Sequence, residues 1–119
     1  MINGSENDVF VILEGWSKPG TFDKFTDYRI EVLKILEPFE PEFLFYCHPF
    51  DWAYDAEEDD YPTGMEICRF RNEETARRAI EAINSSGIRD MEKEVSFKVR
   101  SYMGRFATKE KWDGQIKTD

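Results

Sequence analysis

The side chains of this sequence best suited to move a proton to or from a bound molecule are those of His48 and Tyr102. His48 is the only histidine, and an imidazole ordinarily titrates close to neutral pH. These two residues are therefore the candidate catalytic residues. A structural role stays open for each: His48 can satisfy a local hydrogen bond, and Tyr102 can fill an interface.

A second set of residues has the chemistry to hold a ligand. Guanidinium groups bind carboxylates through charge-assisted hydrogen bonds, so arginines on neighbouring parts of a sheet can clamp the anionic end of a ligand. The aromatic or acyl part of that ligand would lie on apolar side chains nearby. The alternative is that the charged residues pair with one another across strands. The predicted ligand-binding residues are Glu14, Trp16, Arg69 and Arg100.

No metal or cofactor motif accompanies these residues. Zinc sites need a cluster of Cys and His ligands, whereas the chain has one His and two Cys, Cys47 and Cys68. The acidic segment 51–60 lacks the ligand spacing of a calcium-binding loop, and its like charges favour an exposed loop. Phosphate-binding, dinucleotide-binding and Gly-x-Ser-x-Gly motifs are not found. We therefore expect no metal and no cofactor.

The composition limits the class of protein. With 119 residues, 40% hydrophobic and 15% aromatic, the chain can form one domain with its own core. A net charge of −9 disfavours nucleic acid and anionic lipid as partners. We find no transmembrane stretch and no secretory signal, and two cysteines suit a reducing compartment. The expected location is the cytoplasm.

Hydrophobic periodicity predicts the elements that position the candidate residues. The expected elements are strands at 8–16, 42–50, 63–70 and 95–106, and helices at 22–37 and from 73 to about 83. Residues 88–94 fit either a short helix or an irregular link. A single domain then spans residues 8–106, and residues 107–119 form a polar C-terminal tail.

This order of elements predicts a ferredoxin-like α+β fold, with a four-stranded antiparallel sheet and two helices on one face. The opposite face of the sheet, called here the open face, then carries many apolar side chains. A large apolar surface favours association, so we expect a homodimer that buries the open face. Its predicted apolar floor consists of Phe10, Ile12, Met65 and Ile67.

Two strands are harder to orient. In the second strand both parities are aromatic, and Leu44, Tyr46 and His48 are expected on the open face if Cys47 lies opposite Cys68. In the fourth strand the alternation predicts that Val95, Phe97 and Val99 point toward the helices.

Two segments carry a recognisable pattern of residue types: residues 19–45, with Pro19, Phe22, Phe25, Tyr28, Arg29, Leu36, Phe43 and Leu44, and residues 65–76. They resemble the dimeric α/β-barrel superfamily, which includes antibiotic-biosynthesis monooxygenase-like proteins and small uncharacterised domains. The resemblance implies that the open faces of two subunits pack together and that ligands bind between sheet and helices. Some members of that superfamily are cofactor-independent oxygenases, so the resemblance also implies such an activity as one expectation for this chain. Tyr28 and Arg29 either line such a cavity or simply pack against the sheet.

Residues 63–70 and the helix that follows are also similar to the RNA recognition motif, which has the same order of elements. That motif stacks bases on aromatic rings, whereas Met65 and Ile67 occupy those positions here.

We therefore predict a small-ligand-binding or cofactor-independent oxygenase- or isomerase-like protein that acts as a homodimer. The alternative is a protein- or RNA-binding module. The sequence does not distinguish an enzyme from a binding protein.

Overall fold

The computed structural model describes residues 7–53 and 61–106. Residues 54–60 of the predicted acidic loop and the predicted tail at 107–119 lie outside the described residues. A short 3₁₀ helix, η1, follows the first helix at Glu37–Phe39. The remaining elements are β1 (Val9–Ser17), α1 (Phe22–Leu36), β2 (Glu42–Cys47), β3 (Gly64–Phe70), α2 (Glu73–Ser85), α3 (Ile88–Val95) and β4 (Ser96–Gly104).

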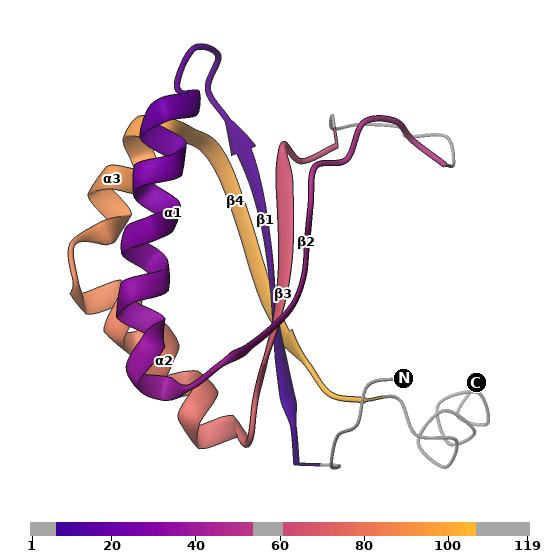
Figure 1. Cartoon of the computed structure of the whole chain (residues 1–119), viewed down its shortest axis with the longest axis vertical. Coiled ribbons are helices and arrows are strands. Elements are labelled where there is room, and N and C mark those ends of the chain that lie inside the picture. Colours follow the sequence, from indigo (N-terminus) through magenta and orange to yellow (C-terminus); the bar gives the residue numbers. More distant parts are fainter. Residues whose placement is uncertain (1–6, 54–60, 107–119) are drawn as a thin grey trace, which may run out of the picture.

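The four strands form one antiparallel sheet in the order β2-β3-β1-β4, and the three helices lie on one side of it (Figure 1). The predicted ferredoxin-like α+β fold is confirmed. The helix layer holds one more helix than expected, because residues 88–94 form most of α3. The left-handed backbone of Gly87, at φ 81°, starts this helix directly after α2.

Local sequence signals account for the helix ends. The side chain of Asn72 accepts a hydrogen bond of 2.8 Å from the backbone N–H of Thr75 and so caps α2. Pro38 lies two residues beyond Leu36, the last residue of α1, in η1, where its ring cannot continue an α-helix. No helix in the described part of the chain combines the length and the apolar composition that a membrane crossing needs.

The core lies between the sheet and the helices. Ala76 and Ala79 are completely buried, and their small side chains let α2 approach the sheet closely. Alternate residues of the two central strands, β1 and β3, point toward the helices and complete this core. The predicted alternation of helix-side and open-face residues in these two strands is therefore confirmed. The buried residues of this cluster are Val9, Leu36, Cys68, Phe70, Ala76 and Ala79.

The predicted orientation of β2 is wrong. Phe43 lies opposite Cys68 and Phe45 opposite Ile67, so Leu44 is an extra residue in β2. This bulge changes the side-chain parity: Cys47 lies opposite Met65, and Tyr46 lies opposite Glu66 on the helix side.

The predicted start of the last strand is also wrong. Val95 is fully buried, but it is the last residue of α3 and not part of β4. Phe97 is 63% exposed because the register shifts between Trp16 and Ser17 at this end of β4. Val99 does lie on the helix side as expected, opposite Gly15.

Candidate ligand site between the sheet and the helices

A hollow lies between the sheet and α1 where two glycines leave space. Gly15 of β1 and Gly64 of β3 are directly paired and both line a cavity of about 40 Å³. A second cavity of about 110 Å³ adjoins it under α1, α2 and α3, and the two share Leu13, Tyr28, Val32 and Glu66 as lining residues. Because apolar side chains form most of the walls, the hollow suits an apolar group.

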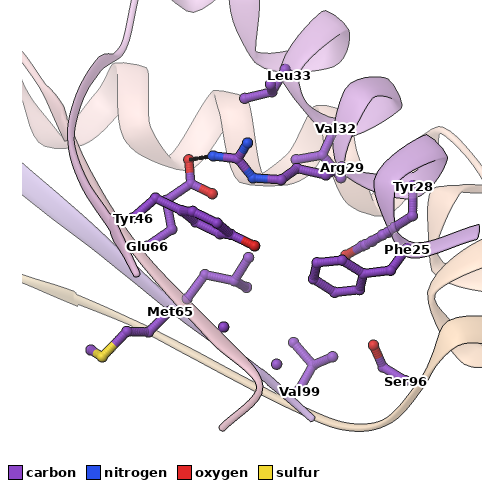
Figure 2. Close-up of a pocket in the computed structure, with 13 residues that line it drawn as sticks. Phe25, Tyr28, Arg29, Val32, Leu33, Tyr46, Met65, Glu66, Ser96 and Val99 are labelled. Atoms are coloured by element: carbon purple, nitrogen blue, oxygen red, sulfur yellow. Dashed lines mark ion pairs between the residues drawn. The ribbon is translucent and has the colours of Figure 1, made fainter. Parts of the chain in front are cut away.

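An ion pair is built into the wall of this hollow. Arg29 reaches from α1 toward Glu66 of β3, with 3.3 Å between Arg29 Nη2 and Glu66 Oε1 (Figure 2). The Glu66 side chain is only 13% exposed and that of Arg29 30%. Burial raises the pKa of the Glu66 carboxyl above its usual value, and the charge of Arg29 opposes this shift.

Two polar atoms of this pair lack hydrogen-bond partners within the described residues. Glu66 Oε1 and Arg29 Nε are both buried, and the ion-pair contact does not have hydrogen-bond geometry. Buried polar atoms are normally hydrogen-bonded, so an acceptor and a donor left without partners beside a cavity are unusual. A bound group that offers both a donor and an acceptor would satisfy them.

Tyr46 lies at the mouth of the hollow. The guanidinium of Arg29 stacks on its ring, 3.9 Å from the centroid. A methyl group on Gly64 would lie 3.2 Å from Tyr46 Oη, so the ring covers the position that the glycine leaves open. Burial raises the pKa of the Tyr46 hydroxyl. The wrongly predicted face of Tyr46 is the reason that sequence reasoning left it out of the site.

A second polar group lines the larger cavity. The hydroxyl of Tyr28 donates a hydrogen bond of 2.8 Å to Glu92 Oε2, and Arg89 Nη1 lies 3.4 Å from the same oxygen. Burial is the main cause that raises the pKa of Tyr28, and Glu92 adds to it. This group joins α1 to α3, and its charges are already paired.

Sequence reasoning noticed Tyr28 and Arg29 but missed Glu66. The signal that could have found Glu66 is its position in the third strand. It has the helix-side parity of Cys68 and Phe70, and a carboxylate at such a position must be paired or perturbed.

Four of the six predicted site residues lie together, on the open face. Arg100 Nε is 3.4 Å from Glu14 Oε1, and burial together with the nearby charge of Glu14 raises the pKa of the Tyr102 hydroxyl. Arg100 also stacks over Trp16, with 5.0 Å to the ring centroid, and Trp16 is buried beneath it. These contacts match the structural alternative of a cross-strand ion pair.

The other two predicted residues lie apart from this group. Arg69 is opposite Phe10, four residues along β1 from Glu14, and it pairs with Asp8 and Glu42 instead of lying beside Arg100. His48 follows β2, and its Nδ1 donates to the carbonyl oxygen of Thr63 at 2.9 Å. Because β2 and β4 are opposite edges of the sheet, His48 and Tyr102 do not share one site.

Metal binding finds no support in the part of the chain that the structure covers. Across residues 7–53 and 61–106, no three His, Cys, Asp or Glu side chains are grouped so that they could hold a metal ion. Cys47 and Cys68 are both free thiols, and burial raises the pKa of Cys68 to about 12.

The fold is shared with several solved structures. SnoaB, a cofactor-independent oxygenase from Streptomyces nogalater, superposes with a TM-score of 0.59 at 12% identity, covering 86% of this chain and 95% of SnoaB. An uncharacterised NIPSNAP-like domain protein from Burkholderia xenovorans gives 0.59 at 8% identity, covering 88% and 89%. A putative antibiotic biosynthesis monooxygenase from Bacteroides thetaiotaomicron gives 0.57 at 14% identity, covering 88% and 91%.

These likenesses define the class of fold. The structural neighbours are antibiotic-biosynthesis-monooxygenase-like and NIPSNAP-like proteins with a ferredoxin-like α/β fold, so the resemblance expected from the sequence is confirmed at the level of the fold. No protein-family model matches the sequence, and no curated protein sequence does. At such low identity the neighbours establish the architecture and not an activity.

Proposed function

We propose that this chain binds a small, uncharged and largely apolar molecule between its sheet and α1. The observation that carries the proposal is the apolar hollow whose wall holds Glu66 Oε1 and Arg29 Nε, both buried and without hydrogen-bond partners in the described residues. The charges of Glu66 and Arg29 offset each other, so a charged ligand would leave one charge buried and uncompensated. An uncharged ligand avoids this cost.

The size of the hollow supports a small ligand of one or two fused rings, because its two cavities adjoin. The larger cavity, of about 110 Å³, approaches the roughly 150 Å³ that accommodates benzene in an apolar protein cavity. Its neighbour supplies room for a polar substituent beside Glu66. SnoaB is described as a cofactor-independent oxygenase. As part of this proposal, that description supports a reaction that the side chains lining the hollow carry out without a cofactor.

The anion clamp expected from Arg69 and Arg100 is not part of this proposal. Arg69 already contacts the carboxylates of Asp8 and Glu42, and Arg100 contacts that of Glu14. The two arginines also lie at different positions along the sheet. A single small anion would have to displace these partners and would still reach only one of the guanidinium groups.

We further propose that the open face is the contact surface of a homodimer. Ile12 lies between Ile67 and Tyr102 at the centre of this face, and Phe45 beside them is exposed. Apolar side chains at the centre of a sheet face that no element of the described residues covers favour burial against a second copy. Sedimentation equilibrium should give the mass of a dimer at micromolar concentration. A monomer would contradict the dimer and favour the binding-module alternative.

The cavity itself is tested with indane, an uncharged bicyclic hydrocarbon. Indane should shift amide resonances of the strands and of α1 that line the hollow in ¹⁵N-labelled protein. Gly15→Leu should abolish these shifts, since a Cβ at Gly15 meets no atom within 4 Å and the larger side chain fills the space. Gly104→Leu is the matched control, because Gly104 has equal space but lines neither cavity.

Two results would contradict a ligand-binding hollow. One is that indane causes no saturable shifts in the wild-type protein up to its solubility limit. The other is that the shifts persist unchanged in Gly15→Leu, which would place the bound indane elsewhere.

A further inference from the structure

Glu66 has the features of a base and not only of a structural ion. It lines both cavities of the hollow, and one of its oxygens is buried without a hydrogen bond in the described residues. Arg29, its single ion-pair partner in this part of the chain, approaches from α1. Glu66 on the sheet side and Arg29 on the helix side thus place a proton acceptor and a fixed positive charge next to the same apolar space (Figure 2).

We propose that Glu66 is a general base that removes a proton from the carbon next to the carbonyl of an uncharged, ring-bearing ketone, and that Arg29 binds the oxygen of the resulting enolate. This inference rests on the proposed ligand site. It adds the substrate class, an enolisable ketone, and a role for each member of the pair.

The step balances without a cofactor. The C–H bond next to the carbonyl breaks, the proton forms an O–H bond with Glu66, and the electron pair moves through the new C=C bond onto the carbonyl oxygen. Return of the proton to the same carbon restores the ketone, and its return to another carbon of a conjugated substrate gives an isomer. No oxidant or reductant is consumed.

The charges of the pair favour this reaction. Before the step, the positive charge of Arg29 is offset by Glu66. After the step Glu66 is neutral, and the enolate oxygen takes its place as the anion beside the guanidinium. One buried ion pair replaces another, so the hollow never holds an uncompensated charge. Such fixed charges stabilise a developing oxyanion best where water is excluded.

The environment also makes Glu66 a stronger base. Burial raises the pKa of its carboxyl, which brings its basicity closer to what proton removal near neutral pH requires. The guanidinium of Arg29 stacks on the ring of Tyr46, which helps to hold it in place. Tyr28 is already committed as a donor to Glu92, so it does not compete for the proton.

Hydrogen–deuterium exchange of 2-indanone in D₂O tests the proposal. This ketone has the ring system of indane and enolisable hydrogens, and NMR follows their loss. Wild-type protein should accelerate the exchange with saturation. Glu66→Gln, which keeps the shape of the side chain, should lower the protein-dependent rate at least about a hundredfold. Asp8→Asn is the matched control, because Asp8 is a carboxylate with a 12% exposed side chain that pairs with Arg69 outside both cavities.

The outcomes separate this inference from the ligand site on which it rests. If indane and 2-indanone bind but the exchange is not accelerated, or is equally fast in Glu66→Gln, the base is overturned and the site stands. If neither molecule binds, both proposals fail. Should Glu66→Gln not fold, Glu66→Asp replaces it: the carboxylate withdrawn by one methylene should slow exchange, and an unchanged rate would overturn the role of Glu66.

Discussion

Two glutamate–arginine pairs lie on opposite faces of the same sheet and differ in what surrounds them. Glu66 and Arg29 face the helices at 3.3 Å, and Glu14 and Arg100 lie on the open face at 3.4 Å. The two carboxylate side chains are almost equally buried, 13% and 12% exposed. Each arginine also stacks on an aromatic ring, Arg29 on Tyr46 and Arg100 on Trp16. The composition of the two pairs therefore does not set them apart.

The difference lies in solvent and in hydrogen bonding. The side chain of Arg100 is 54% exposed, and neither Glu14 nor Arg100 has a buried polar atom without a hydrogen-bond partner among the described residues. The side chain of Arg29 is 30% exposed, and Glu66 Oε1 has no hydrogen bond within the described residues. The open-face pair is thus a satisfied structural contact, whereas the helix-side pair keeps unused bonding capacity beside a cavity. The layer over a charged pair, and not the composition of the pair, therefore decides whether its polar atoms keep unused bonding capacity.

Replacement of the two arginines should separate the pairs most strongly. Arg29→Met should lower the free energy of unfolding by about 3 kcal/mol, because it leaves the Glu66 carboxylate buried without its counter-charge. Arg100→Met should cost at most about 1 kcal/mol, because solvent and Tyr102 still reach Glu14. Urea unfolding of both variants measures this, and equal losses would mean that the two pairs are equivalent.

Charge introduced on each face should reveal which face associates. Ile67→Asp places a charge at the centre of the open face and should weaken dimerisation at least about a hundredfold. Ile30→Asp is the matched control, because Ile30 is exposed on α1 away from that face. Sedimentation equilibrium of both variants is the measurement. A dimer that survives Ile67→Asp and dissociates in Ile30→Asp would place the interface on the helices.

The tyrosine hydroxyls near glutamates on the two faces should also differ. Tyr28→Phe removes the buried donor to Glu92 and should cost about 1–2 kcal/mol of stability. Tyr102→Phe removes an exposed hydroxyl near Glu14 and should cost about 0.5 kcal/mol or less. Thermal or urea unfolding compares them. A larger loss in Tyr102→Phe would show that the open face is the better ordered of the two.

The smallest expected effect is a pH dependence confined to the helix side. The folded-state pKa of Glu66 is raised, so the folded protein binds this proton more tightly than the unfolded chain does, and stability falls as pH rises from 4.5 through the folded-state pKa. Above that pKa the penalty is fully present. Arg29 stays charged, and the raised pKa values of Tyr28, Tyr46 and Cys68 keep these neighbours neutral over this range.

Glu66→Gln removes this dependence. Its stability relative to the wild type should therefore increase between about pH 5 and about pH 7.5, as measured by urea unfolding at each pH. Asp8→Asn supplies the control for a buried carboxylate outside the hollow. A relative stability that decreases over the same interval would mean that the ion pair with Arg29 outweighs burial.

Much of the fold could be predicted because it depends on short-range patterns. Alternation in residues 9–13 and 65–70 places Phe10, Ile12 and Ile67 on the open face, and Asn72 marks the start of α2. The prediction failed in β2, where one inserted residue shifts the alternation of side chains between the two faces of the sheet. The extra residue Leu44 inverts the rest of β2, and a period-2 pattern that is aromatic on both sides contains no signal for it.

The candidate site was harder to predict than the fold, because its parts come from distant segments. The sequence by itself determined the order of elements, the antiparallel class of fold and an apolar open face, since these follow from periodicities of 2 and 3.6 residues along the chain. Tertiary structure alone decided that Arg29 meets Glu66, that Tyr46 covers Gly64, and that Arg69 and Arg100 stay apart. Strand register and helix placement settle such pairings, and both arise from long-range packing that local residue patterns do not encode.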